Sequence, residues 1–296
     1  MLSVCIPVFN YDVRELTTEL FRQMPVESEI LIIDDCSHDS FKEQYKEIQN
    51  EKITVVLLNE NIGRARIRNL FLKYARHENL LFLDCDSQII QPRFLKNYFD
   101  CIQKTYTVVC GGRNYPQKIK NRAYALHWKY GIVRESKSAA TRSLQPNRSF
   151  MTNNFMIRKE IFKKNNFNNK LYNYGHEDTL LGFELLKAGI RIEHINNPVL
   201  HGKLETNKEF LAKTIIGIQN LVFILNELNQ NQEFINNVSL LNFFFRLKKR
   251  GINKTLPFVA IFFGPFISML LRSGFVNLRL FDLYKLFVFA RLYKKH

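Results

Sequence analysis

Acidic residues stand in pairs at the borders of apolar segments. Asp34 and Asp35 follow the run EILII, and Asp84 and Asp86 follow the run LLFL. Residues i and i+2 of an extended segment point to the same side, so the carboxylates of Asp84 and Asp86 can share a hard divalent cation. Solvated acids at a strand end are the simpler reading. The position of the pair in a chain of alternating strands and helices favours the metal site.

A third pair, Glu177 and Asp178, opens the amphipathic segment EDTLLGFELLKAG, which ends at Gly189 as a C-cap. The helix dipole alone favours acids in a first turn. The functional alternative is a general base at Asp178. His201 follows the apolar run PVL; it is either a structural histidine or an additional metal ligand.

Two further segments carry groups that suit a nucleotide. Asp34 and Asp35 can accept hydrogen bonds from a ribose or a base, although aspartates that cap a turn have the same pattern. Within residues 59–69, Gly63 allows close backbone approach, and the helix N-terminus with Arg64 suits an anion. A solvated basic helix face is the alternative for this segment.

The elements that must position these groups alternate between short apolar runs and amphipathic stretches. Strand–helix units of this length predict an α/β fold with a mainly parallel sheet flanked by helices, and the ligand crevice lies at the carboxyl ends of its strands. Residues 114–153 are polar and show no clear period, which indicates a functional or mobile segment. The expected strands are 2–6, 29–33, 53–58, 80–83, 107–110, 154–157 and 191–195, and the expected helices are 13–23, 41–49, 64–75, 93–104, 175–189, 207–228 and 234–249.

The composition points to an anionic partner and a reducing compartment. The net charge is +16, and residues 240–296 hold eleven Lys and Arg, one acid and eleven of the 26 Phe. This combination favours an acidic membrane surface over a soluble ligand. The five cysteines form no CxxC motif, so free thiols are expected. The first residues do not resemble a signal peptide, and a cytoplasmic location is therefore expected.

Residues 255–271 form an uncharged run of 17 residues between basic flanks. As one helix they would reach about 25 Å, less than the roughly 30 Å hydrocarbon core. Pro257, Gly264 and Pro265 make one straight helix less favourable. With the interfacial pattern of residues 275–296, the run predicts monotopic or peripheral attachment to the inner face of the cell membrane. A lid or a dimer contact is the alternative.

The ordered set VCIPVFN, IIDDCSHD, NxGxARxxRN, LFLDCDS and GHEDTLLGFELLKAGIRI resembles the family 2 glycosyltransferases. The resemblance covers about residues 1–205, and it implies a GT-A fold for a catalytic domain at 1–206. Residues 207–296 would then form a helical region associated with the membrane. The final HxxH or QxxRW element of some members is absent, which argues against a processive synthase.

The resemblance also implies a role for each candidate residue. Asp178 would be the general base and Glu177 would hold the acceptor or the site. Mn²⁺ or Mg²⁺ would be bound by Asp86 with Asp84 and His201. The donor would contact Pro7, Phe9, Asp34, Asp35, Gly63, Arg64, Arg68, Asp84 and Cys85. The acceptor side would hold Asn153, Asn154 and His176.

The expected function is therefore inverting transfer of a sugar from a nucleotide diphosphate donor, UDP in the first instance, to a glycan or lipid-linked acceptor in surface polysaccharide synthesis. Two other classes compete with it. A sugar-nucleotide nucleotidyltransferase would show a Gly-rich, basic loop after the first strand, where this chain has VFNYDVREL. A basic protein that binds nucleic acid or membrane without catalysis would have its positive charge on the core. Here the charge gathers in the tail, so no nucleic-acid partner is expected.

Overall fold

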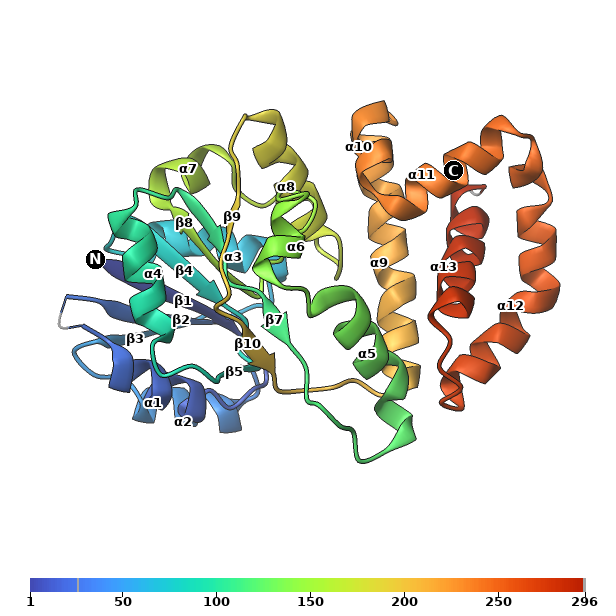
Figure 1. Ribbon diagram of the computed structural model, residues 1–296. Helices are drawn as coiled ribbons and strands as arrows, with labels where there is room; N and C mark the ends of the chain where they lie inside the picture. The colour runs from blue at the N-terminus through green and yellow to red at the C-terminus, as the bar shows by residue number, and fades with distance from the viewer. Residues whose placement is uncertain (26, 295–296) are drawn as a thin grey trace.

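The computed structural model describes residues 1–25 and 27–294. A seven-stranded sheet in the order β3-β2-β1-β4-β8-β6-β9 lies on one side of the molecule, and helices α9 to α13, within residues 207–293, lie on the other (Figure 1). Its strands are β1 (Leu2–Val8), β2 (Glu29–Asp34), β3 (Ile53–Leu57), β4 (Asn79–Leu83), β6 (Val108–Cys110), β8 (Asn154–Arg158) and β9 (Glu193–His194).

The sheet is mainly parallel, as predicted. Strands β1, β2, β3 and β4 pair in parallel, β8 runs antiparallel between β4 and β6, and β9 pairs in parallel with β6. Val8 pairs with Asp34, and Leu83 pairs with Asn154. The residues that follow β1, β2 and β4 therefore meet at one edge of the sheet, where the acidic pairs were expected.

Helices cover both faces of this sheet (Figure 1). Alternate residues of β1 enter two different hydrophobic clusters: Val4 and Ile6 pack with α1 (Arg14–Gln23) and α4 (Phe94–Gln103), and Cys5 packs with α3 (Arg64–Tyr74) and α8 (Glu177–Lys187). Burial on both sides explains why the strands read as continuous apolar runs. The remaining helices of this region are α2 (Asp39–Glu47) and α7 (Lys159–Lys164).

A second, three-stranded sheet was not predicted. It has the order β5-β10-β7, with β5 (Ser87–Ile89), β10 (Val199–His201) and β7 (Arg113–Asn114). Strands of two or three residues are too short to show a period. The register pairs Ser87 with His201, and it thereby brings the segment after β4 against the end of β10.

Residues 114–153 contain more regular structure than their sequence indicated. They form a short 3₁₀ turn at Arg122–Tyr124, α5 (Ala125–Tyr130), a π-helical turn at Gly131–Glu135 and α6 (Ala139–Ser143). Tertiary contacts hold these pieces. The buried Arg142 guanidinium, for example, donates hydrogen bonds to the carbonyls of Lys137, Gly111 and Ile195. The hydrophobic periodicity of the sequence could not predict this structure, because contacts with residues far away in the chain stabilise it.

The C-terminal region is helical, as expected, with a capping box of Thr206 and Glu209 at its start. The expected helix at 234–249 is divided at Val238 into two helices. Residues 256–272 form one helix, and it bends in Figure 1, in line with the expectation that a straight helix is unfavourable here. Pro257 lies in the first turn, where it is tolerated, and Pro265 lies inside the helix. The helices are α9 (Asn207–Glu227), α10 (Gln232–Asn237), α11 (Ser239–Lys249), α12 (Leu256–Arg272) and α13 (Leu278–Tyr293). Lys295 and His296, the end of the predicted interfacial segment, lie outside the described residues.

This region shares its core with the sheet. Leu211 and Leu221 of α9 and Phe289 of α13 belong to the same buried cluster as Phe71 and Phe82. The expected boundary between residues 206 and 207 therefore marks a change of secondary structure, and the residues on its two sides share one hydrophobic core. Among the described residues, only α9 is long and apolar enough to cross a membrane by length and composition, and nine of its residues are buried in the protein.

Candidate active site

The carboxylate of Asp84 lies between two arginines at the end of β4. Arg68 Nη2 is 2.6 Å from Asp84 Oδ1, and Arg113 Nη2 is 3.5 Å from Asp84 Oδ2. Burial raises the pKa of Asp84, but the charges of Arg68, Arg64 and Arg113 outweigh it and lower the pKa below its usual value. Asp84 is therefore an ionised, firmly held group.

Asp86 lies against His201 on the other sheet. Asp86 Oδ2 is 3.3 Å from His201 Nδ1, because β5 and β10 pair in a register that opposes Ser87 and His201. Burial and the neighbouring Asp84 raise the pKa of Asp86 to about 6, while burial and Arg113 lower the pKa of His201 to about 4. At neutral pH the pair is an anionic carboxylate and a neutral imidazole, which are the forms that bind a metal ion.

This pair fits a divalent cation whose shell the substrate completes. No group of three or more His, Cys, Asp or Glu side chains positioned to hold a metal ion occurs in residues 1–25 and 27–294. Asp86 and His201 supply two ligands, and Mg²⁺ and Mn²⁺ commonly take their other ligands from phosphate oxygens and water. The arrangement thus supports an open site on Asp86 with His201, and the two arginines on Asp84 leave that carboxylate less available.

Asp34 and Asp35 have partners within the protein. The carboxylate of Asp34 accepts hydrogen bonds from the backbone N–H and the hydroxyl of Ser37. Asp35 accepts backbone N–H groups of Ile62 at 2.7 Å and Gly63 at 3.1 Å. The turn alternative thus describes Asp34, whereas Asp35 holds the distant loop before α3, and contact of either carboxylate with a nucleotide remains a prediction.

Gly63 and Arg64 form the start of α3 beside this aspartate. Gly63 has φ +83°, and a Cβ there would lie 3.1 Å from the carbonyl oxygen of Tyr172. Only glycine suits this position. Arg64 is half exposed, with its guanidinium 4.7 Å from the ring of Tyr174 and 3.9 Å from Glu177 Oε1. It is an accessible cation at a helix N-terminus, as an anion site requires.

The pair Glu177 and Asp178 begins α8, after His176 in the left-handed region at φ 66°. Glu177 is buried and accepts the backbone N–H of Gly175 at 2.9 Å, so it secures the loop. Asp178 accepts the N–H of Thr179, and burial and the charge of Glu177 raise its pKa to about 6. Such a pKa suits a general base. His176 Nδ1 lies 3.1 Å from the Thr179 hydroxyl, on the same turn.

The two asparagines expected on the acceptor side differ. Asn154 is fully buried. Its amide oxygen accepts a hydrogen bond from the hydroxyl of Tyr98, and its amide nitrogen donates to the carbonyls of Gly112 and Asn197. It cannot reach an acceptor, so the structure corrects that expectation. Asn153, its neighbour, lies in the turn just before β8 and is also buried. Both polar atoms of its buried amide lack a protein partner.

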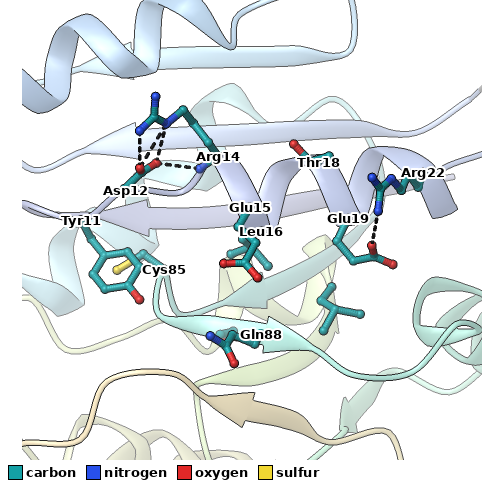
Figure 2. Close-up of a pocket in the computed structure, with 12 residues that line it drawn as sticks. Tyr11, Asp12, Arg14, Glu15, Leu16, Thr18, Glu19, Arg22, Cys85 and Gln88 are labelled. Carbon is teal, nitrogen blue, oxygen red and sulfur yellow. Dashed lines mark hydrogen bonds and ion pairs between the residues drawn. The ribbon is translucent and has the colours of Figure 1, made fainter.

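Three donor-side residues surround the end of β1. Phe9 is half exposed and Pro7 is partly buried. Cys85 lies between Asp84 and Asp86 in the chain, and burial together with the charges of these two carboxylates raises the pKa of its thiol to about 12. A hollow of about 390 Å³ lies between α1 and β5 (Figure 2). Cys85 and Tyr11 line one end of it, and the exposed Arg22 forms an ion pair with Glu19 at the other end. This hollow lies beside the acidic cluster and does not contain it.

Sequence reasoning missed Arg113 and Glu135. Arg113 on β7 contacts Asp84 and, at 3.2 Å, Glu135 of the π-helical turn, and Tyr115 donates a hydrogen bond to the same carboxylate. His127 joins the group through Tyr115, with 3.5 Å between the hydroxyl and the ring nitrogen. No signal in the sequence identified them, because residues 114–153 show no period and the contacts span distant segments.

Comparison with known proteins agrees with this geometry. The sequence profile of glycosyl transferase family 2 matches residues 3–165, more than half of the chain. The protein therefore belongs to glycosyl transferase family 2, and it is a glycosyltransferase with a GT-A fold.

Two curated relatives match over shorter stretches. The chain is 34% identical over 93 residues to TuaG of Bacillus subtilis, named as a teichuronic acid biosynthesis glycosyltransferase, which is 30% of this chain and 36% of TuaG. It is 34% identical over 94 residues to the poly(ribitol-phosphate) beta-N-acetylglucosaminyltransferase TarS of Staphylococcus aureus, which is 29% of this chain and 16% of TarS. The matched segments thus span about a third and a sixth of these proteins.

Solved structures share the fold along nearly the whole chain. Residues 1–349 of S. aureus TarS give a TM-score of 0.53 at 18% identity, covering 99% of this chain and 91% of that one. The mannosyltransferase PcManGT of Pyrobaculum calidifontis, in complex with GDP-Man and Mn²⁺, gives a TM-score of 0.64 at 15% identity, covering 100% and 88%. At these identities the likeness establishes the fold.

Proposed function

We propose that the protein transfers a sugar, with inversion, from a UDP-sugar to a hydroxyl of a glycan or lipid-linked acceptor in surface polysaccharide synthesis. The observation that carries the proposal is the convergence of three groups at one sheet edge. They are the Asp86–His201 pair, the cations Arg64 and Arg68, and a carboxylate with a raised pKa at Asp178.

In this proposal, each residue of the candidate site has a separate role in an inverting displacement. Asp178 takes the proton from the acceptor hydroxyl, because its carboxylate is ionised at neutral pH yet more basic than an ordinary aspartate. Glu177 fixes the loop that carries this base. Arg64 offers an accessible guanidinium to the donor diphosphate, while Arg68 and Arg113 hold Asp84 in place.

Asp86 and His201 would hold Mn²⁺ or Mg²⁺, which supplies Lewis-acid stabilisation of the leaving diphosphate when bound. The names of solved neighbours support a nucleotide-sugar donor. TarS has been solved with UDP and with UDP-GlcNAc, and PcManGT with GDP-Man and Mn²⁺. Because these donors differ in base and sugar, they leave the donor sugar of this protein open.

The test is a panel of UDP-sugars and GDP-mannose, each incubated with purified protein and Mn²⁺, with release of the nucleoside diphosphate as the readout. We expect one or a few donors to be hydrolysed slowly without acceptor, and hydrolysis to fall on chelation with EDTA. Asp178→Asn is the matched variant, since it should keep metal-dependent UDP binding and lose transfer. Absence of binding and hydrolysis for every donor would refute the proposal.

A further inference from the structure

Helix α12 is apolar on all sides, and only one side is covered by protein. Its buried residues recur at helical spacing and face α9 and α13; they are Leu256, Pro257, Ala260, Ile267 and Leu271. A helix that is hydrophobic all round is ordinarily buried in protein or in lipid. The opposite face of α12 therefore needs an explanation.

That opposite face is strongly exposed. Phe262 is 77% exposed, and Phe258, Phe263 and Phe266 are between 55% and 58% exposed. Of the 21 large hydrophobic residues exposed in the described parts of the chain, eight fall within residues 256–275. We call these eight the apolar ridge; they are Phe258, Val259, Ile261, Phe262, Phe263, Phe266, Met269 and Phe275. Contiguous exposed patches of this kind mark contact with a partner or a membrane.

Basic residues border both ends of the ridge, and no acid interrupts it. Between Glu233 and Asp282 the chain contains no Asp or Glu and seven Lys or Arg. Lys294, from the end of α13, lies 4.8 Å from the ring of Phe258, at the start of α12. An apolar surface with a cationic border is complementary to a bilayer with acidic headgroups.

A hollow beside the ridge also combines apolar walls with a cationic side chain. It encloses about 320 Å³ between α12 and α13, and its wall includes Gly264, Pro265 and Val288. The exposed Arg291 is among the residues that line it. Apolar walls with a cation suit an acyl chain beneath an anionic headgroup.

We propose that the apolar ridge of α12 docks the protein on an anionic bilayer leaflet, with the helix lying in the interface. A second copy of the chain is the alternative occupant. It is disfavoured because pairing two ridges would bring two identical cationic borders together. A crossing helix is disfavoured because 17 residues rise about 25 Å, less than the hydrocarbon core.

The docked helix would be connected to the candidate active site through packed elements. Helix α13 packs on α12, and its Asp282 forms a 2.8 Å ion pair with Arg134 of the π-helical turn that holds Glu135. A lipid-linked acceptor would therefore approach from the side of the docked helices. This last step rests on the proposed function, whereas the docking surface does not.

Flotation of the full chain with vesicles tests the docking surface. Protein purified in mild detergent is diluted into vesicles of phosphatidylcholine alone or mixed with phosphatidylglycerol. We expect flotation with the mixed vesicles, and weaker flotation at high salt because the cationic contribution is screened. The double variant Phe262→Asp/Phe266→Asp should bind more than tenfold more weakly, since each phenylalanine loses its burial in lipid. Leu144→Asp is the matched control, because Leu144 is 81% exposed and lies outside the ridge.

The possible results distinguish a membrane from a second copy of the chain as the partner of the apolar ridge. Equal flotation of the double variant and the wild type, or no flotation of the wild type, would overturn the proposal. A wild-type dimer in light scattering that the double variant abolishes, without vesicle binding, would assign the ridge to a second copy. Donor hydrolysis in detergent and the thermal midpoint are measured for every variant, so that failure of the enzyme activity or of folding is seen separately from failure of docking.

Discussion

The raised pKa of Asp178 should make the protein less stable than it would be without this charge. The group has a pKa of 3.8 in its unperturbed state and of about 6 in the fold, because burial and Glu177 disfavour the ionised form. The folded state therefore holds the proton more tightly than the unfolded state. The stability that this preference contributes is complete below pH 3.8 and is lost as the pH rises through about 6.

The size of the effect follows from the shift. The rise from 3.8 to about 6 corresponds to at most about 3 kcal/mol, at about 1.36 kcal/mol for each pKa unit. Asp178→Asn removes the charge and keeps an oxygen that can accept the N–H of Thr179. We expect the variant to unfold with a free energy up to about 3 kcal/mol higher than the wild type at pH 8, and nearly equal to it at pH 4.

Urea unfolding followed by the fluorescence of Trp128, the single tryptophan, measures this difference at several pH values. Other groups titrate in the wild type and in the variant alike, so their contributions cancel in the difference between the two free energies of unfolding. Asp12→Asn is the control: Asp12 pairs with Arg14, and its pKa is lowered by this contact, so its neutralisation should give no gain. A gain of equal size at pH 4 and pH 8 would show that the charge of Asp178 is not its source.

The same variant tests catalysis. Loss of a general base typically lowers kcat by about 10²–10⁴. The wild-type kcat/KM should fall below about pH 6, where Asp178 becomes protonated. Near-normal turnover of Asp178→Asn with intact UDP binding would return Asp178 to the role of a helix cap.

Three further predictions concern the surroundings of this base. Asp86→Ala should abolish the Mn²⁺-dependent part of UDP binding in calorimetry, and unchanged metal dependence would exclude Asp86 as a ligand. Arg113→Met should lower the free energy of unfolding by roughly 2–4 kcal/mol, because it removes the guanidinium that pairs with Glu135 and one of the two that pair with Asp84; a neutral effect in urea unfolding would contradict this. Deletion of residues 240–296 should abolish cooperative unfolding, since these residues complete the core around α9; a sharp transition in the truncated chain would show two independent cores.

The sequence predicted the central sheet because each strand is a buried apolar run with a clear end. Burial on both faces makes β2 and β4 continuous hydrophobic segments, and the acids that follow them mark the edge. The small second sheet could not be predicted from strands of two or three residues. The Asp86–His201 contact spans 115 positions in the chain and depends on that sheet, so the residues alone left His201 either structural or a metal ligand, and the family resemblance placed it with Asp86.

Asn154 shows why neighbouring residues cannot be assigned together. Asn154 is the first residue of β8 and has a fully hydrogen-bonded amide, whereas Asn153 lies in the turn before it and both polar atoms of its amide lack a protein partner. The sequence identified an asparagine pair but not the partners of each member. The partners of Asn154 come from distant parts of the chain, so only the fold reveals them.

The C-terminal region belongs to the site in a way that the family profile does not show, because the matched residues end at 165, before the proposed base. The loop that leads to Glu177 rests on α9: a Cβ on Gly175 would lie 2.8 Å from the Cα of Gly217. Asn220 of α9 donates hydrogen bonds at 2.8 and 2.9 Å to the carbonyls of Asn173 and Gly175. Helix α9 in turn packs against α12 and α13. Helix α9 therefore helps to set the position of the proposed base and also packs against α12, so the proposed base and the apolar ridge belong to one packed unit.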